Sequence, residues 1–123
     1  MKYYPEHAKR GHLKIEAQII DKIITSALKG GYSISVFDGE EYAIRRSTSR
    51  KLIEAECFAT DETTLIFHKG EYPDNKGWVV VSDYKGWVWL IHGNSYDVIS
   101  DYSDNPEIEE ILKPAMQYAE EIA

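Results

Sequence analysis

The class of fold is decided by residues 32–39, which read YSISVFDG. Over residues 32–37 serine alternates with larger apolar or aromatic side chains, and this period of two is typical of a strand with one buried face. The Asp38-Gly39 pair that follows is a signal for a tight hairpin turn. Residues 42–46 form the expected return strand, so the stretch predicts antiparallel pairing.

Three helices are expected around this hairpin. Residues 12–28 repeat apolar side chains at the spacing of one buried helical face, and two glycines end that helix. A short helix is expected over residues 49–58. The last helix begins at Pro106 after Asn105, a residue type that favours the N-cap, and it continues through Pro114 with a kink.

Four more strands complete the predicted sheet, at residues 63–68, 78–82, 87–92 and 96–102. The turn between the second and third of them is expected at residues 83–86, where a glycine closes the turn. Because most of these connections are short, antiparallel pairing is expected throughout.

The element order and the length together predict one domain. The order is helix, two strands, helix, four strands, helix, which is α+β with a mainly antiparallel sheet of about six strands. A chain of 123 residues suits a single domain, here residues 1–123, and can bury a core of its own.

Both faces of the last three predicted strands are apolar, although an antiparallel sheet with one wet face should be polar on one side. Alternation places Val79, Val81, Trp87, Trp89, Ile91 and Ile99 on one face, and Trp78, Val80, Val88, Leu90, Val98 and Tyr102 on the other. Either helices cover both faces, or one face is exposed for a partner. An exposed patch of this kind would measure on the order of several hundred Å², which is large for a monomer. Trp87 and Trp89 are therefore candidate interface residues.

Two further apolar residues widen the stripe of the first helix. Ile19 and Ile23 lie beside the face that one sheet contact needs. Two interpretations remain open, a broad contact with the core or a seam between two copies of the chain. The second adds Ile19 and Ile23 to the interface candidates.

Acidic residues are concentrated toward the C-terminus of a chain whose formal net charge is -7. The acidic candidates are Asp97, Asp101, Asp104, Glu107, Glu109, Glu110, Glu120 and Glu121. They are either a solvated surface with a favourable first helical turn, or a surface for a basic partner. The net charge argues against direct binding of a nucleic-acid backbone.

The one basic run lies where a strand leads into a helix N-terminus. Arg45, Arg46, Arg50 and Lys51 are candidates for binding an anion there. The run lacks the glycines of a phosphate-binding loop, and its serines and threonine are suited to cap the helix instead.

No catalytic residue, metal site or cofactor is predicted. Cys57 is the only cysteine, so an internal disulfide is impossible, and it is expected to be a buried apolar residue rather than a nucleophile. His92 is expected on the face opposite Asp97 and Asp101, so these three do not converge on a metal. No run approaches the ~20 apolar residues of a membrane span, and no signal peptide is visible, so the cytoplasm is the expected location.

Part of the sequence resembles a known group of proteins. Residues 86–94 (GWVWLIHGN) and 96–105 (YDVISDYSDN), followed by Ile108 and Glu109, are similar to the C-terminal part of small uncharacterised proteins of bacteriophages and prophages. The resemblance covers about 40 residues, up to Glu121. It implies a bacterial or phage setting and an accessory role, without an activity or a site.

Three hypotheses of function follow. The first is a non-enzymatic accessory protein that acts through protein–protein interaction, as a homodimer. The second is an acidic mimic of nucleic acid, which requires the acids from Asp97 to Glu121 to share one face. The third is a small hydrolase or ligand-binding protein, which requires a concave pocket where His92 or His68 meets a carboxylate.

Overall fold

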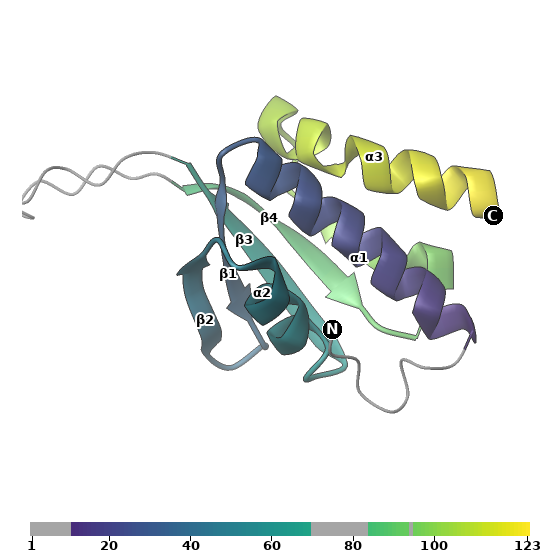
Figure 1. Cartoon of the computed structure of the whole chain (residues 1–123), viewed down its shortest axis with the longest axis horizontal. Coiled ribbons are helices and arrows are strands. Elements are labelled where there is room, and N and C mark those ends of the chain that lie inside the picture. Colours follow the sequence, from purple (N-terminus) through teal and green to yellow (C-terminus); the bar gives the residue numbers. More distant parts are fainter. Residues whose placement is uncertain (1–10, 70–83, 94) are drawn as a thin grey trace, which may run out of the picture.

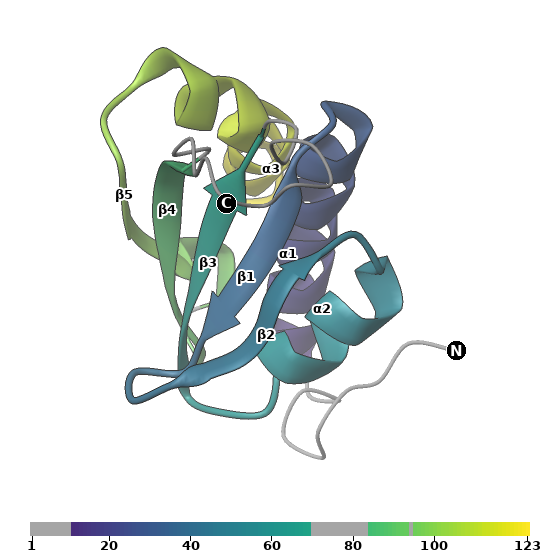
Figure 2. The same cartoon turned by 90° about the vertical axis from the view of Figure 1, so that its left-hand side faces the viewer.

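A computed structural model describes residues 11–69, 84–93 and 95–123 (Figures 1 and 2). Its helices are α1 (Gly11–Lys29), α2 (Arg50–Cys57) and α3 (Pro106–Ile122), with one 3₁₀ turn, η2 (Ser95–Asp97). The three predicted helices are confirmed, and their ends differ from expectation by one or two residues where they are described.

The strands form one antiparallel sheet in the order β2-β1-β3-β4-β5. Their bounds are β1 (Ser33–Phe37), β2 (Tyr42–Ser47), β3 (Glu62–His68), β4 (Tyr84–Ile91) and β5 (Ile99–Tyr102). The α+β class is confirmed, with five strands in the described part of the chain.

All three helices lie on the same face of the sheet; Figure 2 shows the strands side by side, with the helices behind them. α1 packs against both α2 and α3, and the core fills the space between this helical layer and the sheet. The largest fully buried side chains come from both layers: Phe58, Phe67, Ile19, Ile20, Ile23, Ile24, Ile34, Ile53, Leu65, Leu90, Ile108 and Leu112.

The hairpin between β1 and β2 forms as the sequence predicts. The Asp38 backbone N–H donates to the Glu41 carbonyl over 3.0 Å, and Gly39 takes a φ of +104°. The Asp38 carboxylate also accepts hydrogen bonds from the backbone N–H groups of Glu40 and Glu41, both 2.9 Å long. These bonds hold the pKa of Asp38 below its usual value.

Asn105 fixes the start of α3 and ties it to the sheet. Its Oδ1 accepts from the Ile108 backbone N–H over 2.9 Å, which is the predicted N-cap. Its Nδ2 donates to the Lys85 carbonyl in β4 over 3.0 Å. α3 continues through Pro114, as expected.

The strand pairing corrects the prediction for residues 83–86. Tyr84, Lys85 and Gly86 are not in a turn but begin β4, which pairs directly with β3 from His68↔Tyr84 to Glu62↔Ile91. The predicted strand 78–82 lies outside the described residues. Gly86 was expected to close a turn because glycine is common in turns. Its φ is +152° in the structure, and its lack of a side chain serves packing, since a Cβ there would lie 2.4 Å from Ile108 Cγ1.

A second correction concerns Ile99, which was expected beside Trp89. The ladder passes from Trp89↔Asp101 to Leu90↔Ile99, so one residue of β5 is skipped between these pairs. This irregularity turns Ile99 to the other face, where it packs against the core.

Candidate interaction surface

Large side chains cover the face of the sheet that lies opposite the described helices. We call this surface the aromatic face. It forms a shallow hollow of about 590 Å³, lined by Phe37, Tyr42, Thr64, Ile66, His68, Tyr84, Trp87 and Trp89. Its residues come from all of β1 to β4, so the sheet itself holds them in place.

The register of the sheet places five of the side chains on this side in one row. Antiparallel pairing aligns Tyr42 with Phe37, Phe37 with Thr64, Thr64 with Trp89, and Trp89 with Asp101. The row therefore crosses all five strands at one height. Paired residues in a sheet point to the same side, which carries Asp101 onto the aromatic face as well.

The aromatic side chains of this face are substantially exposed. Exposure is 36% for Trp89, 39% for Tyr42 and 51% for Tyr84. Phe37 and Tyr42 meet edge to face, with ring centroids 5.3 Å apart, and Tyr84 contacts the His68 ring at 6.4 Å. These contacts order the rings without covering them, so apolar area is left for another molecule to bury.

Charged groups lie at both ends of the aromatic face and in its middle. At the β2 end, the Arg45 guanidinium lies 4.2 Å from the centroid of the Tyr42 ring, and the acidic residues Asp38, Glu40 and Glu41 form the adjacent hairpin turn. In the central strand β3, the Glu62 carboxylate accepts a 3.1 Å hydrogen bond from Trp89 Nε1. At the β5 end, Asp101 is exposed and pairs with Trp89 of β4.

The four interface candidates from the sequence divide into two pairs. Trp87 and Trp89 lie on the aromatic face. Ile19 and Ile23 have no exposed surface, since the core of a single chain buries both of them. Of the two interpretations of these isoleucines, their burial supports the broad contact with the core and not a seam, because α1 needs the wide stripe to contact the sheet and two other helices.

The sequence reasoning missed Phe37, Tyr42 and Tyr84 as members of this surface. The alternation of side chains in the two strands beside the Asp38-Gly39 turn could have identified Phe37 and Tyr42. Tyr84 was missed because residues 83–86 were expected to form a turn.

The basic candidates do not form one anion site. Arg45 stacks on Tyr42 at the aromatic face, whereas Arg50 begins α2 in the helical layer and lies 3.5 Å from an Asp21 carboxylate oxygen. Lys51 is exposed on α2, and Arg46 has a φ of +48°. Ser49 caps α2 by accepting from the Leu52 backbone N–H, as the sequence favoured.

The acidic candidates are also divided between two sides of the molecule. Asp101 lies on the aromatic face, whereas Glu107, Glu109, Glu110, Glu120 and Glu121 belong to α3 in the helical layer. Asp97 lies in η2, and Asp104 precedes α3. The acids therefore do not share the single face that mimicry of nucleic acid requires.

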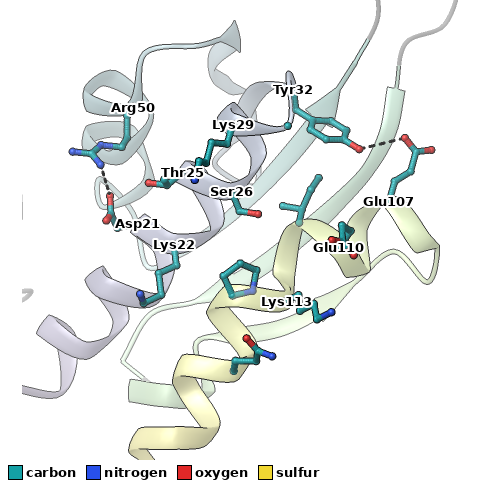
Figure 3. A pocket seen from close by; sticks show the side chains of 14 residues that line it. Asp21, Lys22, Thr25, Ser26, Lys29, Tyr32, Arg50, Glu107, Glu110 and Lys113 are labelled. Atoms are coloured by element: carbon teal, nitrogen blue, oxygen red, sulfur yellow. Dashed lines mark hydrogen bonds and ion pairs between the residues drawn. The ribbon is translucent and has the colours of Figure 1, made fainter.

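A groove of about 720 Å³ runs through the helical layer (Figure 3). α1 contributes Lys22 and Lys29 to its walls, and α3 contributes Glu110 and Lys113. None of the described residues that line it is a histidine or a cysteine. This groove is therefore not the pocket of the hydrolase hypothesis, in which His92 or His68 meets a carboxylate.

One contact in the groove joins the residue before β1 to α3. The Tyr32 hydroxyl donates to a Glu107 carboxylate oxygen over 3.4 Å. Burial raises the pKa of Tyr32, and the nearby charge of Glu107 raises it further.

His92 does meet a carboxylate, but within the core. Its Nδ1 lies 3.4 Å from Glu16 Oε1, and the two side chains are 3% and 0% exposed. The Thr63 hydroxyl donates to the Cys57 carbonyl over 2.8 Å, so the 3.3 Å contact with His92 requires a proton on Nε2. Hydroxyl, imidazole and carboxylate are aligned as in a hydrolase, yet Thr63 is 1% exposed and cannot reach a substrate.

The same carboxylate has a structural role. Glu16 Oε2 accepts from the backbone N–H groups of Gly93 and Ser95, over 2.7 and 2.9 Å. Glu16 therefore fixes the turn between β4 and β5 to α1.

The remaining expectations about chemistry concern Cys57 and metal binding. Cys57 is fully buried, as predicted, and burial raises the pKa of its thiol, with a further increase from Glu54. Within residues 11–69, 84–93 and 95–123, no three acidic, histidine or cysteine side chains are grouped to hold a metal. In the same residues, no helix has the length and apolar character that crossing a bilayer demands.

No protein-family model, curated protein or solved structure matches the chain. The functional conclusion therefore rests on the geometry of the aromatic face.

Proposed function

We propose that this protein is a non-enzymatic interaction protein that acts as a homodimer, with the aromatic face of each copy as the contact surface. The observation that carries the proposal is the exposure of tryptophan and tyrosine rings on a sheet whose other face holds every described helix. Burying such rings is a strong driving force for association. An accessory role in a bacterial or phage cytoplasm, implied by the C-terminal resemblance, agrees with a protein that acts by binding.

A second copy fits this surface because it brings a matching apolar surface of its own. Phe37, Trp87 and Trp89 line the aromatic face, and two copies can bury these rings against each other.

The size of the face predicts a weak dimer. Five strands at ~4.8 Å spacing, each with about five residues at ~3.3 Å, make a face of roughly 20 by 17 Å. That is about 350 Å² for each copy, well below the ~800 Å² typical of a stable complex. We therefore expect a dimer that forms at tens to hundreds of micromolar, on the order of a transient interaction.

Analytical ultracentrifugation tests the proposal. The wild-type mass should rise with concentration from 14.1 kDa toward twice that value. Trp89→Thr should remain monomeric, because threonine suits an exposed strand position but removes most of the apolar area. Leu52→Gln is the matched control, because Leu52 is 55% exposed on α2, away from the aromatic face. It should associate like the wild type.

Two results would overturn the proposal. One is a wild-type chain that stays monomeric up to about 1 mM, where even a weak specific contact should be populated. The other is Trp89→Thr associating as strongly as the wild type while its circular dichroism shows an intact fold.

A further inference from the structure

The core contains two titratable side chains that the proposed function does not use, Glu16 in α1 and His92 just after β4. His92 Nδ1 lies 3.4 Å from Glu16 Oε1, and both side chains are buried. Within residues 11–69, 84–93 and 95–123, neither of these two atoms has a hydrogen-bond partner. The neighbouring groups show where the protons of this contact must lie.

The far nitrogen of the His92 ring carries a proton. The Thr63 hydroxyl has a single proton, which it donates to the Cys57 carbonyl over 2.8 Å. His92 Nε2 lies 3.3 Å from the same hydroxyl oxygen and must therefore donate to it. The opposite tautomer would turn the Thr63 proton toward Nε2 and leave two oxygen acceptors 2.8 Å apart with no proton between them.

The near nitrogen then decides the charge of the ring. A neutral ring with its proton on Nε2 has a lone pair on Nδ1, and that lone pair would lie against an oxygen of Glu16. Two buried acceptors that face each other are both left unsatisfied, which costs free energy. A proton between Nδ1 and Oε1 satisfies both atoms.

The hydrogen bonds of Glu16 place that proton on the ring. Glu16 Oε2 accepts from the backbone N–H groups of Gly93 and Ser95, over 2.7 and 2.9 Å. Two donors to one oxygen favour the ionised form of the carboxylate. The pair is therefore an imidazolium ion facing a carboxylate, an arrangement in which buried charges are paired and hydrogen-bonded.

The ionisable groups of the neighbouring elements are acidic. α2 brings the Cys57 thiol, which burial keeps protonated, and the buried Glu54, whose charge acts on that thiol. Asp61 before β3 and Asp97 in η2 are exposed. In the described part of the chain, none of the ring's interactions is with a cation. These surroundings favour a positive ring.

We infer that Glu16 and His92 hold one proton between them in the core, as an imidazolium–carboxylate pair, and that this proton sets how firmly α1 holds the turn between β4 and β5. Loss of the proton would leave the Nδ1 lone pair against Oε1, so the contact would become repulsive. The hydrogen bonds from Gly93 and Ser95 to the same carboxylate would then weaken. This pH-sensitive contact is independent of the proposed homodimer, because neither side chain lies on the aromatic face.

Nitrogen-15 NMR of the histidine side chains tests the position of the proton. At about pH 8 an ordinary histidine ring is neutral and has one protonated nitrogen. His92 should instead show two protonated ring nitrogens at that pH. A single protonated nitrogen in His92 would overturn the inference.

Glu16→Gln is the variant that removes the need for the shared proton. The glutamine oxygen can still accept from the turn, and its N–H₂ group can donate to Nδ1. At about pH 8, His92 in this variant should therefore carry a proton on Nε2 alone. Glu120→Gln, at an exposed position of α3, is the matched control and should keep both protons on His92. A doubly protonated ring in Glu16→Gln would show that Glu16 does not hold the proton.

Amide hydrogen exchange tests the effect on the turn. As the pH is raised and the ring loses its second proton, the protection of the Gly93 and Ser95 amides should fall by about tenfold or more, relative to an unstructured peptide at the same pH. The Asp38 amide, which donates to the Glu41 carbonyl, should keep its protection, as should Gly93 and Ser95 in Glu16→Gln. Unchanged protection of Gly93 and Ser95 in the wild type would overturn the control of the turn, as would a ring that keeps both protons until the whole chain unfolds.

Discussion

At the scale of single residues, β4 shows how one step along a strand separates the buried core from the aromatic face. Val88 and Leu90 have no exposed surface and face the helices. Trp87 and Trp89, one position away, line the aromatic face. The alternation of β4 was readable from the sequence, but the side that the helices cover was not, because both sides are apolar.

Leu90→Ala should destabilise the fold by about 2–5 kcal/mol, through lost transfer free energy and the cavity left behind. Urea unfolding monitored by circular dichroism measures this, with Leu52→Ala as the exposed control. A denaturant midpoint equal to that of the wild type would show that Leu90 is not a core residue.

Glu16→Ala should cost roughly 2–4 kcal/mol, because it leaves the Gly93 and Ser95 backbone N–H groups and the buried His92 side chain without the carboxylate that faces them. Glu16→Gln should cost less, since its amide oxygen can still accept from the turn. Thermal melts of both variants, compared with the exposed Glu120→Ala, check this order. Equal melting temperatures for all three variants would show that Glu16 does not stabilise the fold.

The raised pKa of Tyr32 predicts that the fold loses part of its stability at alkaline pH. Its pKa is raised in the folded state above the usual 10.0, so the unfolded chain releases this proton first as the pH rises. The contribution is fully present below pH 10 and is lost as the pH approaches the raised folded value. Between pH 10 and that raised value, the free energy of unfolding of Tyr32→Phe should therefore fall less steeply than that of the wild type. Parallel pH profiles for the two proteins would contradict this.

At the scale of elements, helix ends and the first hairpin were predictable because local residues decide them. Asn105, Pro106 and the Asp38-Gly39 turn act within a few positions of the chain. The start of β4 was not predictable, because Gly86 is required by contact with Ile108, a residue distant in sequence. The bulge that turns Ile99 toward the core is likewise a property of the β4–β5 pair.

Gly86→Ala should destabilise the protein by about 2 kcal/mol or more, because the new Cβ would overlap Ile108 and the backbone φ is unfavourable for alanine. A double-mutant cycle isolates the overlap. Combined with Ile108→Ala, the substitution should cost less than the sum of the two single changes. Strict additivity in urea unfolding would show that the overlap with Ile108 is not the cause.

At the scale of the whole molecule, the sequence identified an excess of apolar surface but not all of its positions. The sequence left open whether helices cover both faces of the sheet or one face is exposed. In the described part of the chain, Trp87 and Trp89 lie on the face that no helix covers. The apolar width of α1 was misleading at Ile19 and Ile23, because a helix between a sheet and two other helices needs the same pattern as a dimer seam. The row from Tyr42 to Asp101 could not be predicted, since it depends on the register of four strand pairs.

The central claim is that a second copy covers the aromatic face, and isotope-filtered NMR tests it most directly. In a mixture of ¹³C-labelled and unlabelled chains near millimolar concentration, nuclear Overhauser effects pass between copies only where protons lie within about 5 Å, the range of direct packing contact across an interface. The account predicts such effects between rings of the two aromatic faces, with the Trp89 indole among them. Intermolecular effects confined to other surfaces, or none in a sample that sediments as a dimer, would contradict it.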